Sequence, residues 1–281
     1  MSHRSVEVFH LVWRPFGIGP LERFVASYHA QSAGEQHRLT LIFNGFESET
    51  EISDLLERLP KFGHNEMRMK QRSMDLECYR AATMQSDADY VFFLNSYCEI
   101  LSEQWLAKMM SAACSGKGAI VGATGSWESR FTSLQLESEK LRFRSPLLDR
   151  LRSVAVPLVA TKLLMRFPRF PNPHLRTNAF GGRRAVINEQ WPQMLSTKEA
   201  TFRCESGRQS LTKRLLTSGH CVKIVGKDGR AFGVEEWPAA GSYASRDQEN
   251  LLIADNQTEK YRKMDSLERA SARRKIWGEI S

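Results

Sequence analysis

Short apolar runs alternate with helical patterns along the first part of the chain. Val6–Trp13 is rich in β-branched and aromatic residues and predicts a strand, whereas residues 21–30 place their apolar side chains on one helical face. Further strands are expected at 38–43, 67–70, 90–94 and 119–121, and further helices at 51–59, 75–84 and 102–113. This βαβ rhythm predicts an α/β fold with a mostly parallel central sheet flanked by helices.

The ends of the predicted strands are the expected binding edge. Ligands of open parallel sheets bind beyond the carboxyl ends of the strands. Those ends are Trp13-Arg14, Asn44-Gly45, Asn95-Ser96 and residues 122–124, and we expect them to line one site.

The pattern changes after residue 125. Helices are expected at 134–143 and 147–165, a proline-rich extended segment at 167–173, a strand at 177–180, a helix at 208–218 ended by Gly219, a strand at 222–225 and a helical tail from 248. The region is basic: residues 140–184 hold eleven Lys or Arg and one acid, Asp149. This segment alone has a net charge of +10, whereas the whole chain has a net charge of +8. The remaining residues therefore sum to −2. The pattern predicts an anionic partner (a nucleotide diphosphate, a lipid phosphate, a membrane surface or nucleic acid), and a solvated basic face is the alternative.

Several classes of protein are not supported by the sequence. The five cysteines are widely spaced without a CxxC pair, and no His/Cys cluster has metal-ligand spacing, so neither a disulfide framework nor structural zinc is expected. The Gly-x-Gly-x-x-Gly and Walker patterns are missing as well. We see no apolar leader and no apolar run of spanning length. We therefore expect a cytoplasmic protein, with residues 154–170 as either a core helix or a contact with the inner membrane face.

Four segments together resemble a GT-A-fold, family-2-like glycosyltransferase. They are the strand ends Trp13-Arg14 and Asn44, the helix at 75–82, the strand and loop at 90–97, and residues 172–180 with 205–215. The resemblance implies one domain over 1–281, with a nucleotide-sugar-binding half at 1–125, a basic insertion with the acceptor and catalytic half at 126–235, and a tail at 236–281 as a candidate lid. It implies transfer of a sugar from a nucleoside diphosphate to a glycan or lipid-linked hydroxyl, as in polysaccharide biosynthesis.

The resemblance also implies residue roles on the donor side. The predicted donor-binding residues are Arg14, Asn44, Asp75, Arg80, Asn95 and Ser96. The family's DxD motif, which holds a divalent metal such as Mn²⁺ or Mg²⁺, falls on Asn95-Ser96-Tyr97 here. Because a neutral amide is a poor substitute for a carboxylate ligand, metal binding is in doubt, and Glu99 is the nearest acid that could contribute. Arginines are then expected to stabilise the leaving diphosphate, with Arg176, Arg183 and Arg208 as candidates.

On the acceptor side, Glu205 is the predicted general base. A carboxylate at hydrogen-bond distance can remove the proton of an attacking sugar hydroxyl. His174, Arg176, Asn178 and Arg208 are predicted to orient phosphate or acceptor. Asp75 as a helix N-cap and Glu205 as an acid at a helix start are the structural alternatives.

Two other functions stay open at this point. The basic segment could follow a nucleic-acid backbone in an enzyme that glycosylates nucleic acid. A protein of this fold that lost its acids could also bind a nucleotide sugar without turning it over.

Overall fold

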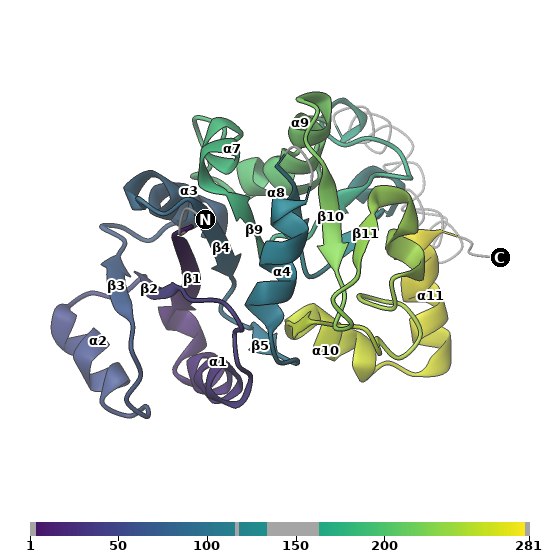
Figure 1. Ribbon diagram of the computed structural model, residues 1–281. Coiled ribbons are helices and arrows are strands. Elements are labelled where there is room, and N and C mark those ends of the chain that lie inside the picture. The colour runs from purple at the N-terminus through teal and green to yellow at the C-terminus, as the bar shows by residue number, and fades with distance from the viewer. Residues whose placement is uncertain (1–3, 116–117, 134–162, 279–281) are drawn as a thin grey trace, which may run out of the picture.

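One central sheet organises the molecule. The computed structural model describes residues 4–115, 118–133 and 163–278 (Figure 1). The strands of the sheet are β1 (Val6–Trp13), β2 (Arg38–Asn44), β3 (Asn65–Arg68), β4 (Tyr90–Leu94), β6 (Ile120–Gly122), β9 (Ala179–Arg183), β10 (Val222–Val225) and β11 (Ala231–Gly233). They lie in the order β11-β10-β6-β9-β4-β1-β2-β3.

Most neighbouring strands run parallel, as the sequence predicts. β3, β2, β1 and β4 are successively parallel, and β6 is parallel to β10. β9 lies between β4 and β6 and runs antiparallel to both, and β11 is antiparallel at the edge. The strand expected at 177–180 is thus β9, and its direction was not foreseen. A glycine lets β9 fit there, because a Cβ at Gly181 would lie 2.3 Å from the ring of Phe92.

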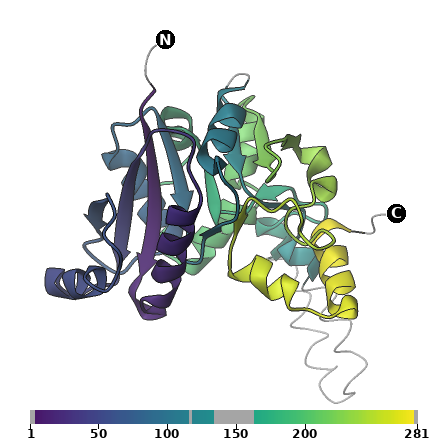
Figure 2. The same ribbon diagram turned by 60° about the horizontal axis from the view of Figure 1, so that its bottom comes forward.

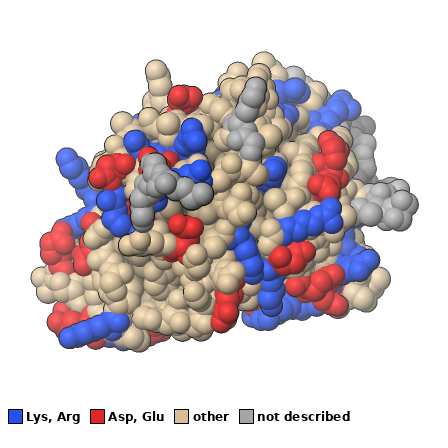
Figure 3. Space-filling view, in the orientation of Figure 1, with Lys and Arg blue, Asp and Glu red and all other residues tan. Residues whose placement is uncertain are grey.

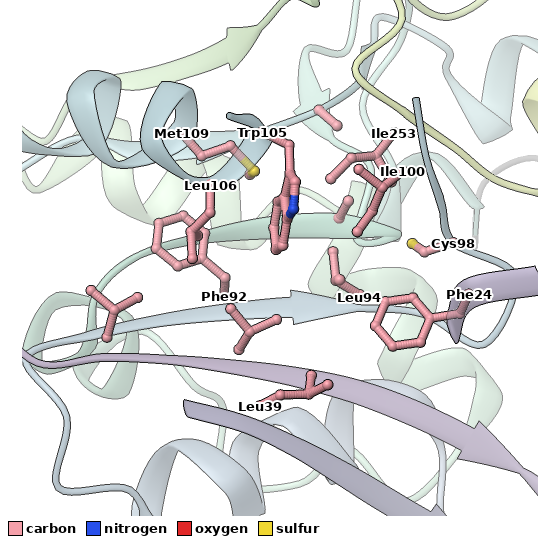
Figure 4. Close-up of a cluster of buried hydrophobic side chains, with 14 of the residues drawn as sticks. Phe24, Leu39, Phe92, Leu94, Cys98, Ile100, Trp105, Leu106, Met109 and Ile253 are labelled. Carbon is pink, nitrogen blue, oxygen red and sulfur yellow. The ribbon is translucent and has the colours of Figure 1, made fainter. Parts of the chain in front are cut away.

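Helices cover both faces of the sheet. One face packs against α1 (Gly19–Ala30), α2 (Glu49–Leu56) and α4 (Trp105–Cys114). The other packs against α3 (Asp75–Gln85), α7 (Arg184–Glu189), α8 (Lys198–Ser206) and α9 (Leu211–Thr217). Figure 4 shows the first core, where Trp105 and Leu106 of α4 lie over Phe92 and Leu94 of β4. Burial of all five residues of β4 confirms the central strand expected there.

The end of the chain returns to the carboxyl edge of the sheet. The short strand β12 (Ile253–Ala254) pairs with β5 (Glu99–Ile100), which follows β4. The helices α10 (Asn256–Arg262) and α11 (Ser266–Trp277) come next. In Figure 1, β1 begins beside the N label and runs downward, and α10 lies at the bottom; Figure 2 turns this lower edge toward the viewer. α10 and α11 confirm the mostly helical tail that the sequence predicted from residue 248.

Two parts of the sequence-based prediction differ from the structure or lie outside it. The helix expected at 208–218 is α9, which begins at Leu211 after the Ser210 cap. The preceding helix, α8, was not expected from the sequence. Gly219 follows α9 with a φ of 77°, which fits its expected place after the helix end. The helices expected at 134–143 and 147–165 fall on residues 134–162, outside the described residues. Among the described helices, none is both long enough and apolar enough to cross a bilayer.

Candidate active site

A polar cavity of about 400 Å³ opens at the carboxyl edge of the sheet. Six of the residues predicted for the site line it: Asp75, Asn95, His174, Arg176, Asn178 and Glu205. They come from α3, the loop after β4, β8 (His174–Leu175) with the turn that follows it, and α8. Residues from four separate parts of the sequence thus meet in one place.

Glu205 lies in the last turn of α8, so the prediction that it sits at a helix start is wrong. A negative charge near a helix C-terminus is disfavoured by the macrodipole, and helix stability therefore does not explain this acid. One oxygen, Oε1, accepts hydrogen bonds from the backbone N–H and hydroxyl of Thr177, at 3.0 and 2.9 Å. Among the described residues, none donates a hydrogen bond to Oε2, which leaves that oxygen for a proton from a ligand.

Asp75 is a second carboxylate in the same cavity. It is the first residue of α3, and Met74 rather than Asp75 is the N-cap. Its Oδ1 accepts the N–H of Leu76 at 2.8 Å. Burial, and then the negative charge of Glu205, raise the pKa of Asp75 from 3.8 to about 6. The charge of Glu205 therefore favours the protonated form of Asp75.

Asn178 connects the strand ends and leaves an amide group without a partner. Its backbone carbonyl accepts the N–H of Asn95 at 2.7 Å, and its Oδ1 accepts the hydroxyl of Thr124 at 2.8 Å. The residue is 5% exposed, and within the described part of the chain its Nδ2 has no hydrogen-bond partner. A buried donor without a partner is costly and needs an explanation. A ligand oxygen in the cavity would supply one.

Arg176 is held in place by the tail of the chain. Its Nη2 lies 2.7 Å from Oδ2 of Asp255, and the two side chains are 13% and 1% exposed. The guanidinium carbon lies 3.9 Å from the ring centroid of Tyr243. Burial lowers the pKa of Arg176, but the nearby acid charges, Asp255 foremost, outweigh it and raise the pKa overall. Arg176 is thus a fixed cation whose charge Asp255 already balances.

Asp255 both caps α10 and forms the ion pair with Arg176. Its Oδ1 accepts the N–H groups of Gln257 and Thr258, which caps α10, while its other oxygen meets Arg176. Asp255, Asn256, Gln257 and Tyr243 line the cavity, although the sequence supported no more than a candidate lid over 236–281. The polar run 255–258 was visible in the sequence, but nothing there paired it with Arg176.

Arg130 is a second cation of the cavity that the sequence did not single out. Its guanidinium carbon lies 3.9 Å from the ring centroid of Phe202 on α8. Among the described residues, no carboxylate forms an ion pair with it. Glu128, two residues earlier, is instead paired with Lys275 of α11 at 3.2 Å. Arg130 is therefore the guanidinium here that is available to an anionic group.

His174 faces the cavity as a neutral ring. Its Nδ1 donates a hydrogen bond to the carbonyl of Asn172 at 2.7 Å, because a carbonyl can only accept. Burial lowers the pKa of His174, and the charge of Glu205 opposes this effect. The remaining nitrogen, Nε2, is then an acceptor for a hydroxyl.

The other predicted site residues lie outside this cavity. Arg14 is paired with Glu47 and Glu51, and Arg80 with Glu77. Asn44 exchanges two hydrogen bonds with the backbone of Ser73, which ties the end of β2 to the segment before α3.

Three further candidate residues from the sequence analysis also lie outside this cavity. Arg208 lies beyond α8 in a different cavity, and Glu99 lines a neighbouring one beside α10. Arg183 pairs with Tyr90 at the start of β4, the edge opposite to Asn95, because β9 is antiparallel. Ser96 is buried beside Asn95.

The residues at the DxD position do not fit a divalent cation. Asn95 Oδ1 accepts the N–H of Tyr97 at 3.0 Å, and the Tyr97 ring packs against Phe16 with centroids 4.6 Å apart. No group of three or more His, Cys, Asp or Glu side chains in the described residues could hold a metal ion. A hard cation prefers several carboxylate oxygens, and this position offers one neutral amide.

Comparison with known proteins gives distant likenesses. No family model and no curated protein matches the sequence. Among solved structures, the chain is similar to a mannosyltransferase, PcManGT from Pyrobaculum calidifontis in complex with GDP-Man and Mn²⁺, with 10% identity and a TM-score of 0.48 over 86% of this chain and 61% of that one. It is also similar to GalNAc-T7 with UDP, GalNAc and Mn²⁺, with 16% identity and a TM-score of 0.32 over 42% of this chain and 22% of that one. The chain thus spans less than two thirds of either protein.

Proposed function

We propose that this chain is a GT-A-like glycosyltransferase that moves a sugar from a nucleoside diphosphate to a hydroxyl acceptor. The observation that carries the proposal is the cavity in which Glu205, Asp75 and Asn178 meet at the carboxyl edge of the sheet. Its carboxylates and neutral amides suit sugar hydroxyls. The sheet order and the sequence resemblance point in the same direction.

Glu205 serves as the general base in this proposal. Thr177 fixes Oε1, and Oε2 takes the proton of the acceptor hydroxyl. The acceptor oxygen bonds to the anomeric carbon while the bond from that carbon to the diphosphate oxygen breaks. The bonding electrons leave with the diphosphate. Glu205 therefore holds the proton, and the diphosphate holds the electron pair.

Arg130 and Asn178 stabilise the leaving diphosphate. The Nδ2 group of Asn178 has no partner among the described residues, and Arg130 forms no ion pair with any of them. A guanidinium fork and a fixed amide are suitable donors for phosphate oxygens. Arg176 is less suitable for this task, since Asp255 balances its charge. Its predicted phosphate role stays a prediction, as does that of Arg208.

The acceptor we propose is a glycan or a lipid-linked saccharide. Several groups around the cavity are neutral or anionic hydrogen-bonding groups. His174 Nε2 and Asp75 can accept hydrogen bonds, and the side-chain amides of Asn256 and Gln257 can both donate and accept them. Such groups match hydroxyls better than a second phosphate chain. A nucleic-acid acceptor is therefore not favoured by this site.

A ligand screen by thermal unfolding tests occupancy of the site. Nucleoside diphosphates and their sugars are added to the native protein and to Asn178→Ala, with manganese and with a chelator. We expect at least one ligand to raise the native midpoint by mass action, with the chelator having little effect. Loss of a hydrogen bond to a buried donor should weaken binding to Asn178→Ala about tenfold.

Asn188→Ala, at an exposed position of α7, is the matched control and should respond like the native protein. The proposal is wrong if no ligand in the panel shifts the midpoint. It is also wrong in its placement of the donor if Asn178→Ala responds like the control.

A further inference from the structure

A second cavity, of about 590 Å³, lies on the other side of α8 from the candidate active site. We define the arginine–methionine surface as Met165, Arg166, Met194, Arg203, Arg208 and Arg214, all of which line this cavity. The transfer reaction proposed above assigns no step to this surface, although the sequence analysis named Arg208 as a candidate phosphate or acceptor residue. On the face shown in Figure 3, by comparison, basic and acidic side chains are interspersed.

The charge of this surface is strongly positive. Its four arginines face one acid of the lining, Glu199, which pairs with Arg166 at 2.5 Å. Arg208 donates from Nε to the carbonyl of Leu164. This partner is neutral, so it does not balance the positive charge of Arg208. Burial, and then the positive charge of Arg208, lower the pKa of Lys213, so a further cation stands near Arg208. Cations held this close repel one another and favour an anionic partner.

Arg214 adds a buried donor that lacks a partner. Its Nη1 donates to the carbonyl of Gln209 at 2.8 Å, but within the described part of the chain its buried Nε has no hydrogen-bond partner. Unpaired buried donors are rare in native proteins and mark places where a ligand completes the hydrogen bonding. A phosphate oxygen is an anionic acceptor that matches the N–H donors of a guanidinium in charge and geometry.

Large apolar side chains stand beside these cations. Met165 and Met194 are each 74% exposed, and Leu216 of α9 is 42% exposed. Flexible apolar side chains next to arginines are typical of surfaces that lie at the boundary between lipid headgroups and acyl chains. Aromatic rings, on which bases of single-stranded nucleic acid would stack, are missing from the described lining of this cavity.

We propose that the arginine–methionine surface docks on a bilayer rich in anionic phospholipid. The arginines bind headgroup phosphates, and the two methionines enter the apolar boundary. The docking does not depend on the proposed reaction. α8 connects the two sites, because Arg203 and Cys204 line the second cavity while Phe202, Glu205 and Ser206 line the first. Docking would therefore place Glu205 one helix away from the membrane surface, within reach of a membrane-anchored acceptor.

Vesicle binding tests this surface directly. The full chain is sedimented with vesicles of phosphatidylcholine alone and of equal parts phosphatidylcholine and phosphatidylglycerol. We expect binding to the anionic vesicles only, and weaker binding at high salt. The double variant Arg203→Gln with Arg208→Gln should lower the partition coefficient about tenfold to thirtyfold. Met165→Ser with Met194→Ser should also lower it while leaving its salt dependence in place.

The control removes the same charge elsewhere. Arg58→Gln with Lys61→Gln, at exposed positions beyond α2, should bind vesicles like the native protein. Thermal unfolding checks that each variant is folded. The proposal is overturned if the native protein does not bind anionic vesicles, or if the arginine pair binds them as well as the control pair does. It is equally overturned if the arginine pair weakens binding to an RNA or DNA oligonucleotide but not to vesicles. Because none of these results depends on turnover, a failed transfer assay would not affect this test.

Discussion

At the scale of single residues, the sequence predicted chemical types better than partners. Asp75, Asn178 and Glu205 do share one cavity, as expected from the positions of their segments. Arg14 was expected there too, but Glu47 and Glu51 from the segment after β2 pair with it instead. Arg130 was overlooked because its neighbours, Phe202 and the cavity itself, come together only in the folded chain. Ion pairs between distant segments leave no local signal in a sequence.

Asp75 provides a test of the site's electrostatics through stability. Its pKa is raised from 3.8 to about 6 in the folded protein. Because the unfolded chain loses this proton at a lower pH, folding is most favoured below about pH 4, and the advantage is lost as the pH rises through about 6. Asp75→Asn keeps the oxygen that accepts from Leu76 but cannot ionise. It should raise the free energy of unfolding at about pH 8 by roughly 1–3 kcal/mol and change it little near pH 3.5.

Urea unfolding at the two pH values measures this difference. Asp54→Asn, at an exposed position of α2, is the control and should have little effect at either pH. An equal effect of Asp75→Asn at both pH values would show that burial beside Glu205 does not shift this group.

At the scale of elements, the first half of the chain was predictable and the second was less so. The apolar pattern located β1, β2, β4 and α4 because each buries a continuous run or a clear stripe. α8 was missed because its sequence, Lys198 to Ser206, buries only Thr201 and Cys204 and gives almost no apolar period. The direction of β9 could not be inferred, since a glycine-rich strand fits either orientation until its neighbours are known.

The N-caps of α10 and α11 offer a matched pair of substitutions. Asp255 and Asp265 both accept backbone N–H groups at the start of their helices. Asp265 is exposed, so Asp265→Ala should cost about 1 kcal/mol of stability for the lost cap. Asp255→Ala also leaves buried Arg176 without its ion pair and should cost about 3–5 kcal/mol. Denaturant unfolding of both variants checks this, and equal costs would mean that the Arg176 pair adds nothing to stability.

At the scale of the whole molecule, the candidate site depends on two distant parts of the chain. The strand ends of the first half supply Asn95 and, through α3, Asp75. The segment after β11 adds Tyr243 and Asp255, which β12 brings beside β5. The sequence indicated a tail that could approach the site, but pairing between two-residue strands so far apart in sequence has no readable pattern. The fold class was therefore predictable from the sequence. The side of the cavity that Tyr243 and Asp255 form was not.

The proposed membrane surface is also a feature of the whole molecule, because its residues come from separate segments of the chain. It lies one helix away from the transfer site, so docking and catalysis would share α8. The sequence predicted an anionic partner for the basic segment 140–184, but of the arginines of this surface that segment contains only Arg166. Residues 140–162 of the segment lie outside the described residues. In the described structure, arginines 203, 208 and 214 line one cavity together with two exposed methionines. Of these arginines, only Arg208 was predicted as a site residue from the sequence.

The central claim, that Glu205 is the base of a glycosyl transfer, is tested most directly by release of nucleoside diphosphate. The native protein, Glu205→Gln and Glu189→Gln are each incubated with a panel of nucleoside-diphosphate sugars and candidate saccharide acceptors, and the released diphosphate is measured. Glu189 is an exposed acid at the last position of α7, so it matches Glu205 in type and helix position without lining the cavity. We predict turnover by the native protein and Glu189→Gln, and a loss of about 10²–10⁴-fold in Glu205→Gln. Undiminished turnover by Glu205→Gln, or no release from any donor by the native protein, would contradict the account.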